Sequence, residues 1–198
     1  MIKVAITGFI GNGKTFCSNI FNQKYKVPLF NADLETKQLY YNQDIKNEVE
    51  SILNTTITND DKSIDFKKIA NILFNDINQL KTVTNILHPL LYEKYKLFCQ
   101  EHENEKYTLF ESALIYQSNS VDKFDKIILV HSDLNTVIER VIKRDNCNRL
   151  DVLQKLLLQR NNLYVNQLDY KNLKHDFLLK NDETIHEQIN QIHNSLTI

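Results

Sequence analysis

The sequence predicts an α/β fold with a doubly wound, mainly parallel sheet of about five strands. Two observations predict it: short apolar segments alternate with longer segments of helical period, and a glycine-containing loop connects the first strand to the first helix. Strands that alternate with helices pair in parallel, and ligand sites lie at the carboxyl ends of such strands. A chain of 198 residues is long enough for one such domain with a small appended lobe.

The expected strands are short runs of apolar, often β-branched residues. In chain order they cover Val4–Ile6, Val27–Asn31, Thr108–Tyr116, Lys126–Val130 and Asp176–Lys180. Segments of helical period are expected at residues 14–25, 34–53, 65–101, 133–143, 149–163 and 183–196. The first helix is expected to present one apolar face that contains Phe16, Cys17, Ile20 and Phe21.

The helical block between the second and third strands is too long for a single crossover connection. It predicts a helical lobe inserted after the second strand, in which the polar stretch at residues 54–63 is an internal linker.

All three glycines of the chain lie in the stretch GFIGNGKT, residues 8–15, which matches the phosphate-binding P-loop pattern GxxxxGK[ST]. Glycines let backbone N–H groups approach phosphate oxygens, and the following helix N-terminus adds partial positive charge. Lys14 would reach the outer phosphates of ATP, and the Thr15 hydroxyl would ligate Mg²⁺. The alternative is a glycine-rich turn with a chance lysine. The loop residues expected to bind ATP are Gly8, Ile10, Gly11, Asn12, Gly13, Lys14, Thr15 and Phe16.

The composition argues against several classes of protein. With 24 basic and 25 acidic side chains, neither a general nucleic-acid binder nor a membrane-surface binder is expected. No stretch reaches the ~20 apolar residues of a membrane span, so we expect a cytoplasmic protein that is a monomer or a weak homo-oligomer. The cysteines form no CxxC pair and are expected to be reduced, buried thiols: Cys17, Cys99 and Cys147.

The P-loop alone does not choose between a kinase, a GTPase and an ATPase. The chain lacks a guanine-specificity sequence of the NKxD type, and its length suits a small phosphotransferase. Asp33 follows the second strand, where a carboxylate can accept the proton of an acceptor hydroxyl; the alternative is a helix cap. Glu111 ends the third strand and either holds metal-bound water or is a surface charge. The cations Arg140, Arg144 and Arg149 suit phosphate oxygens, unless they lie on a solvated helix face.

In their order and spacing, these motifs resemble the dephospho-coenzyme A kinases, a family of P-loop kinases, over nearly the whole chain. The resemblance rests on the loop GFIGNGKT, the sequence NAD at residues 31–33, HPLL at 88–91, RVIKRD at 140–145, Arg149 with Gln159 in the next helix, and a final KND. It implies a P-loop kinase core at about residues 1–33 and 106–198, a helical coenzyme-binding lobe at about 34–105 and a helical lid at about 144–172. The implied reaction transfers the γ-phosphoryl group of ATP to the ribose 3′-hydroxyl of dephospho-coenzyme A, with Mg²⁺.

The resemblance also implies roles for individual residues. The catalytic residues would be Asp33 as base, together with Lys14 and Arg140, and Thr15 would be the metal ligand. Arg144 would contact ATP. The acceptor would be bound by Asp33, Lys37, His88, Arg140 and Arg149.

The chain departs from the family pattern at four positions. Asn31 replaces an aspartate, Lys37 an arginine, Ala113 a proline and Gln117 an acidic residue. Two other hypotheses stay open. One is a different small-molecule P-loop kinase, for a nucleoside or a nucleoside monophosphate, because the sequence pattern does not resolve the acceptor specificity of the helical lobe. The other, motivated by the departures at Asn31, Lys37 and Gln117, is a nucleotide-binding regulatory protein without transfer activity.

Overall fold

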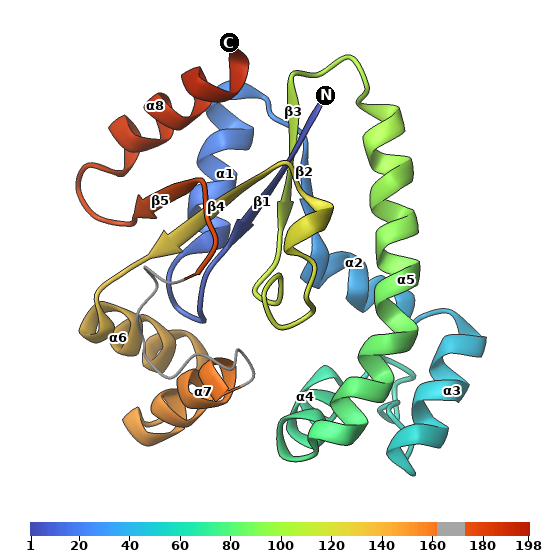
Figure 1. Ribbon diagram of the computed structural model, residues 1–198. Coiled ribbons are helices and arrows are strands. Elements are labelled where there is room, and N and C mark those ends of the chain that lie inside the picture. Colours follow the sequence, from blue (N-terminus) through green and yellow to red (C-terminus); the bar gives the residue numbers. More distant parts are fainter. Residues whose placement is uncertain (162–172) are drawn as a thin grey trace. The chain divides into compact units, whose positions relative to one another are not determined.

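The computed structural model describes residues 1–161 and 173–198, which form two compact units (Figure 1). The sheet unit comprises Met1–Asn31 and His102–Ile198, and the helical unit comprises Ala32–Glu101. The expected lid falls partly on residues 162–172, outside the described residues.

The sheet unit contains a parallel five-stranded sheet in the order β2-β3-β1-β4-β5. Both the α/β class and the parallel sheet are thereby confirmed. The strand order places β1 at the centre, between β3 and β4, so the loop that leaves the carboxyl end of β1 emerges between two neighbouring strands. The described strands are β1 (Ile2–Thr7), β2 (Leu29–Asn31), β3 (Tyr107–Glu111), β4 (Lys126–His131) and β5 (Phe177–Lys180).

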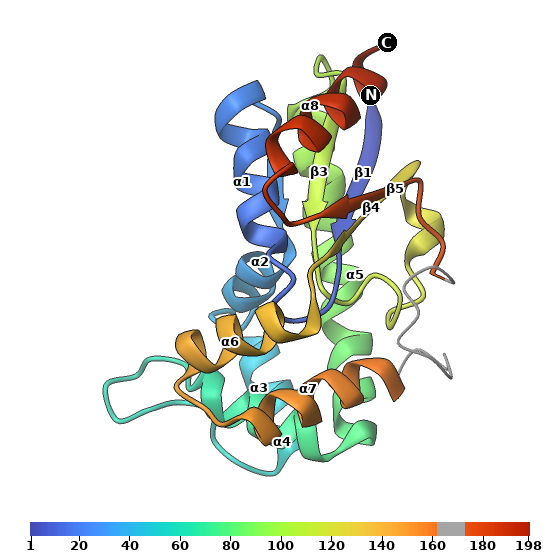
Figure 2. The same ribbon diagram turned by 90° about the vertical axis from the view of Figure 1, so that its left-hand side faces the viewer.

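Two helices, α1 (Lys14–Tyr25) and α8 (Ile185–Thr197), cover one face of this sheet and lie side by side (Figure 2). Cys17 and Phe21 of α1 are fully buried against the sheet, and burial raises the pKa of the Cys17 thiol to about 12. Phe16 is 52% exposed, so its expected place on the apolar face is wrong. The helical period puts residues 17 and 21 four apart on one face and turns Phe16 aside.

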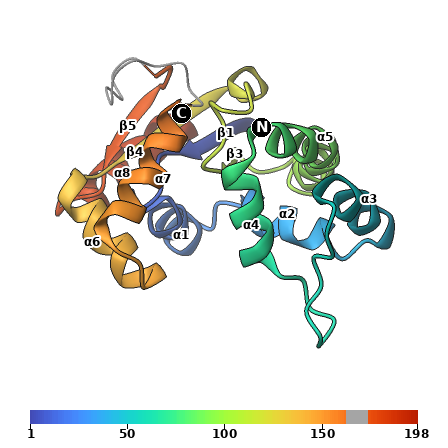
Figure 3. The same cartoon turned by 90° about the horizontal axis from the view of Figure 1, so that it is seen from below.

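Two further helices, α6 (Leu134–Asp145) and α7 (Arg149–Asn161), lie side by side (Figure 3). Val137, Val141 and Val152 form a small apolar cluster between them, against which Phe9 and Ile10 of the glycine loop also pack. Cys147 joins this cluster but is only half-buried, which corrects the expectation of three buried thiols; Cys17 and Cys99 are buried. The loop and the α6–α7 pair thus share one core.

The third strand is shorter than expected, because it ends at Glu111 rather than near Tyr116. The Ser112 hydroxyl accepts a hydrogen bond from the Leu114 N–H at 3.1 Å, which turns the chain. Ile115 is then buried in the core rather than paired in a strand. A short 3₁₀ helix, η1 (Val121–Lys123), leads into β4.

The helical unit consists of α2 (Ala32–Leu39), α3 (Gln43–Leu53), α4 (Phe66–Asn75) and α5 (Ile77–Glu101). Asn42 caps α3 through bonds from the Asp44 and Ile45 N–H groups, which divides the first expected helix. The second expected helix is divided at Asp76, whose backbone is extended and whose Oδ1 accepts bonds from the Asn78 and Gln79 N–H groups. Helices α3 and α4 pack beside the N-terminal half of α5 (Figures 1 and 3). Their shared core includes Tyr40, Val49, Leu53, Ile57, Ile64, Ile69, Val83 and Leu87.

No helix in the described ranges combines the length and the apolar character needed to cross a membrane.

Candidate active site

The glycine loop, residues 8–15, connects β1 to α1, and all three of its glycines stand where a side chain would clash. An ideal Cβ on Gly8 would lie 2.4 Å from the Val130 carbonyl oxygen, and one on Gly13 would lie 2.0 Å from Nδ2 of Asn181. Gly13 also has a φ of 87°, in the left-handed region that favours glycine. It precedes the first turn of α1, whose N–H groups lack partners within the helix, an arrangement that favours anions.

Asn12 fixes the conformation of this loop from inside the protein. The residue is buried, and its Nδ2 donates a hydrogen bond of 2.8 Å to the Val130 carbonyl. The Asn12 carbonyl accepts two further bonds, from the Ser132 hydroxyl at 3.1 Å and from Asn181 Nδ2 at 3.0 Å. The ends of β4 and β5 therefore anchor the loop.

A buried carboxylate, Glu111, lies beside the start of α1. Its Oε1 accepts a bond from the Thr15 hydroxyl at 2.5 Å. Its Oε2 accepts bonds from the Ser18 hydroxyl at 2.7 Å and from Asn31 Nδ2 at 3.2 Å. Glu111 is 4% exposed, so it is not the surface charge that the sequence left as an alternative. Asn31 supplies a donor here, whereas an aspartate would place a second carboxylate against Glu111.

Two cations of the sheet unit lie at the loop. The Lys14 Nζ is 3.3 Å from the Phe9 carbonyl oxygen, so the side chain folds back along the loop. From α6, Arg140 donates through Nη1 to the Ser132 oxygen at 3.1 Å, and Ser132 in turn contacts Asn12. Lys14, which belongs to the loop, and Arg140, which belongs to α6, therefore both lie at the loop.

Arg144 does not join them, because its guanidinium pairs with the carboxylate of its neighbour Asp145. The Nε–Oδ1 and Nη2–Oδ2 distances are 2.7 and 3.1 Å. The hydrogen bond from Arg144 lowers the pKa of Asp145, as does the ammonium of Lys155. Arg149 begins α7 and is exposed.

The remaining predicted residues belong to the helical unit. Asp33 is the second residue of α2 and is exposed; it lies inside the first turn and is not a residue preceding the helix. The Lys37 ammonium lies 5.4 Å from the centre of the Phe66 ring, a cation–π contact. His88 is half-buried in α5, with its ring 6.1 Å from that of Tyr92.

Besides its apolar packing, helix α7 is hydrogen-bonded to the loop through the Gln159 side chain. The Ile10 N–H donates a bond of 2.9 Å to Oε1 of Gln159, and the Gln159 carbonyl accepts a 3.4 Å bond from Gln117 Nε2. The Ile10 N–H, which the sequence predicts to be part of the ATP-binding loop, is therefore bonded to a protein acceptor in this structure. Gln117, a departure at the sequence level, helps to hold α7 beside the loop.

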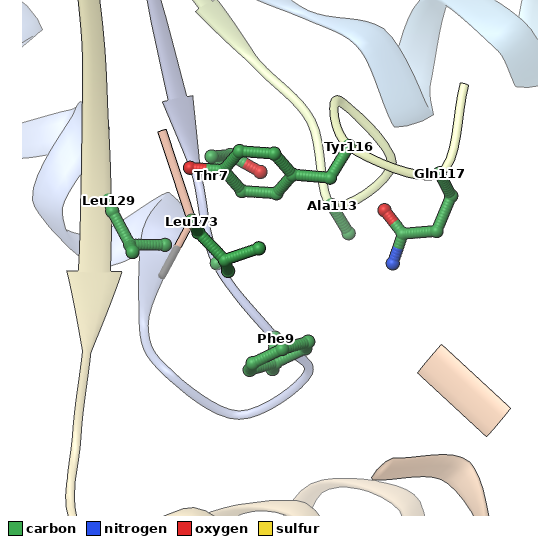
Figure 4. A pocket seen from close by; sticks show the side chains of 8 residues that line it. Thr7, Phe9, Ala113, Tyr116, Gln117, Leu129 and Leu173 are labelled. Atoms are coloured by element: carbon green, nitrogen blue, oxygen red, sulfur yellow. The ribbon is translucent and has the colours of Figure 1, made fainter. Parts of the chain in front are cut away.

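A small pocket adjoins the loop at the end of β1 (Figure 4). Phe9, Tyr116 and Leu129 are among its lining side chains. Two buried polar atoms of this lining, Thr7 Oγ1 and Gln117 Oε1, have no hydrogen-bond partner among the described residues. Buried polar atoms are usually paired with protein or with ordered water, so these two atoms are exceptions.

A family model described as dephospho-CoA kinase matches residues 2–187. The chain belongs to the dephospho-CoA kinase family. Among curated members of the family, the dephospho-CoA kinase of Fusobacterium nucleatum is 31% identical over 156 residues, which are 78% of each chain. The dephospho-CoA kinase of Shouchella clausii is 24% identical over 198 residues, 98% of this chain and 97% of the relative.

Solved structures share the fold of this dephospho-CoA kinase family member. The Thermus thermophilus protein TT1252 superposes with a TM-score of 0.76 at 19% identity, covering 98% of this chain and 95% of its own. The dephospho-CoA kinase from Campylobacter jejuni superposes with a TM-score of 0.66 at 20% identity, covering 98% and 96%.

Sequence reasoning missed two residues that shape the site in this family member, Ser132 and Asn181. Ser132 carries no motif signal, because a serine after a strand is common in any α/β protein. Asn181 stands in the KND sequence that contributed to the resemblance, but its contact with Asn12 joins residues 169 positions apart. The parallel pairing of β1 with β4 brings Ser132 to the loop, and the pairing of β4 with β5 brings Asn181 there.

Proposed function

We propose that the protein transfers the γ-phosphoryl group of ATP to the ribose 3′-hydroxyl of dephospho-coenzyme A, giving coenzyme A and ADP in the last step of coenzyme A biosynthesis. One observation carries this proposal. A complete GxxxxGK[ST] loop is folded and anchored at the carboxyl end of the central strand, in a chain of the dephospho-CoA kinase family.

In this proposal the loop binds the phosphates of ATP. The N–H groups at the start of α1 face no intrahelical partner and suit phosphate oxygens. Lys14 exchanges its contact with the Phe9 carbonyl for the outer phosphates, and Arg140 neutralises charge that develops on the transferred group. Arg144 contacts ATP only after its pair with Asp145 opens.

The residues beside the loop fit Mg²⁺. Thr15 and Glu111 offer a hydroxyl and a carboxylate oxygen 2.5 Å apart, and Mg²⁺ binds oxygen ligands through one or two such groups, substrate phosphates and water. Thr15 would hold the ion directly, and Glu111 would orient Thr15 or a metal-bound water. When bound, Mg²⁺ neutralises charge on the β- and γ-phosphates.

The acceptor side of the proposal rests on the family motif and on chain position. Asp33 comes two residues after the end of β2 and is an exposed carboxylate, available as the base for the 3′-hydroxyl. Lys37, His88 and Arg149 are proposed acceptor contacts. We assign coenzyme binding to residues 34–105 and a lid to residues 144–172, in a cytoplasmic protein that is a monomer or a weak homo-oligomer without nucleic-acid or membrane partners.

The test is a phosphoryl-transfer assay on the purified protein with ATP and Mg²⁺. Dephospho-coenzyme A is offered beside adenosine, AMP and other nucleoside monophosphates, and the products are identified by mass. A mass gain by dephospho-coenzyme A alone is the expected result. Transfer to another acceptor would refute the substrate assignment, and ATP binding without any transfer would indicate a regulatory protein.

The variant Asp33→Asn tests the base. The turnover number should fall at least ~100-fold, since an amide cannot accept the proton, while the dissociation constant of MgATP stays within about twofold. Asp60→Asn, an exposed aspartate of the same helical unit, is the matched control. Near-normal turnover by Asp33→Asn would show that another group is the base.

A further inference from the structure

Ser132 connects the guanidinium of Arg140 to the backbone of the glycine loop. It follows β4 and precedes α6, and it is 7% exposed. Its oxygen lies 3.1 Å from Arg140 Nη1 and 3.1 Å from the Asn12 carbonyl oxygen. One hydroxyl therefore contacts both a candidate catalytic cation and the P-loop.

The direction of these hydrogen bonds is determined by chemistry. A carbonyl oxygen can only accept, so the single Ser132 proton goes to Asn12. A guanidinium can only donate, so the Ser132 oxygen accepts from Arg140. Donation by a cation polarises the hydroxyl and strengthens the bond to Asn12, so the two bonds reinforce each other.

The hydrogen bonds to the Asn12 carbonyl set the orientation of the peptide between Asn12 and Gly13. The peptide is planar and trans, so the Gly13 N–H points away from the Asn12 carbonyl. Ser132 and Asn181 hold that carbonyl on the side of β4 and β5. The Gly13 N–H is thereby turned away from Ser132 and Asn181.

The hydrogen bond to Ser132 restricts the long and exposed side chain of Arg140. Among the described residues, the Ser132 oxygen is the hydrogen-bond acceptor of Arg140. An exposed arginine otherwise samples many rotamers. If the Arg140 side chain is held in one rotamer before the reaction, the entropy cost of ordering it does not add to the activation free energy. The contact holds the guanidinium beside the loop rather than in solvent.

We propose that Ser132 is a positioning residue for phosphoryl transfer, which holds Arg140 against the loop so that its charge is in place when the γ-phosphoryl group moves. The proposal rests on the proposed function, which gives Arg140 its role. Asn181 still holds the Asn12 carbonyl when Ser132 is removed, so Ser132 acts mainly on turnover and little on MgATP binding.

The experiment is a double-mutant cycle on the full chain, with Ser132→Ala, Arg140→Met and the double variant. The turnover number and the dissociation constant of MgATP are measured for each, and thermal unfolding confirms that each variant is folded. Ser120→Ala is the matched control, because Ser120 is also a buried serine of the sheet unit but lies before η1. Ser132→Thr, which keeps a hydroxyl, tests rescue.

Loss of one hydrogen bond to a charged group should lower the turnover number of Ser132→Ala about tenfold, with the MgATP dissociation constant within about threefold. In the Arg140→Met background the same substitution should change turnover less than twofold, and Ser132→Thr should restore most of the activity.

The proposal is overturned if the turnover number of Ser132→Ala equals that of Ser120→Ala. It is also overturned if the turnover number of the double variant falls by the full product of the losses of Ser132→Ala and Arg140→Met. Should Ser132→Ala not fold, Ser132→Cys replaces it, since a thiol of similar size is a weak acceptor. A wild-type protein that phosphorylates a different acceptor would refute the proposed substrate, and the same cycle on that acceptor would still test Ser132.

Discussion

Gly13→Ala is the substitution whose consequences the structure defines best. The new methyl group would lie 2.0 Å from Nδ2 of Asn181, and it would stand on a backbone with a φ of 87°. We expect a less stable protein that binds MgATP at least about tenfold more weakly, because the loop must reshape at the first turn of α1.

The expected loss of stability has two parts. A left-handed backbone is about 1–2 kcal/mol less favourable for alanine than for glycine. Asn181 must also move away from the methyl group and lose its bond to the Asn12 carbonyl, which contributes about 1 kcal/mol. The free energy of unfolding should therefore fall by roughly 2–3 kcal/mol.

Urea denaturation of four proteins separates these parts: the wild type, Gly13→Ala, Asn181→Ala and the double variant. Asn181→Ala alone should lower the free energy of unfolding by about 1 kcal/mol, since it removes the same bond. In the Gly13→Ala background it should change almost nothing, because the bond is already lost. Asn194→Ala, at an exposed asparagine of α8, is the control.

Two results would refute this reasoning. A Gly13→Ala protein within about 0.5 kcal/mol of the wild type would show that the loop accepts a side chain. Full additivity of the two substitutions would show that Asn181 does not meet the new methyl group.

Three further predictions concern charge. Lys14→Ala should weaken MgATP binding and lower turnover, each at least ~tenfold, because the mobile cation is lost. Glu111→Gln should lower turnover at least ~tenfold, since the Thr15 and Ser18 hydroxyls lose their charged acceptor. Burial, and then the charge of Lys24, lower the pKa of His193. The unfolded chain therefore binds this proton more readily, and the free energy of unfolding should decrease as the pH falls from about 7 to about 5.

Each of these has a matched control in an exposed residue of the same type: Lys106→Ala, Glu105→Gln and His186→Gln. Unchanged MgATP binding by Lys14→Ala would remove that residue from the phosphate site. Equal turnover of Glu111→Gln and Glu105→Gln would leave the buried carboxylate without a functional role. For the histidine, His193→Gln should flatten the decrease between pH 7 and 5, and a slope equal to that of His186→Gln would assign the proton uptake elsewhere.

Local sequence patterns predicted the elements of the fold well, because β-branched runs and helical periods are properties of neighbouring residues. They were wrong where a single side chain changes the chain direction. Ser112 ends β3 by accepting a backbone bond, and an apolar run from residue 113 to 116 hides that turn. Similarly, the helical period cannot separate Phe16 from Cys17 until the face that meets the sheet is known.

The phosphate loop could be predicted because its pattern is contiguous, whereas the contacts that hold it are distant in sequence. Glu111 was found as a strand-end carboxylate, but its burial depends on donors from α1 and β2. Ser132 gave no signal at all. The departure at Asn31 becomes intelligible only in three dimensions, where its amide satisfies Glu111.

The anchoring of the Asn12 carbonyl has a consequence for synthesis of the protein. The loop is made within the first fifteen residues, but the strands beside β1 begin at Tyr107 and Lys126, and the second donor to Asn12 is residue 181. A growing chain therefore carries the GxxxxGK[ST] sequence long before the residues that anchor the loop have been synthesised. The native conformation of the loop depends on contacts of high sequence separation, which form slowly. On the ribosome, competence to bind nucleotide should be among the last properties that the nascent chain acquires.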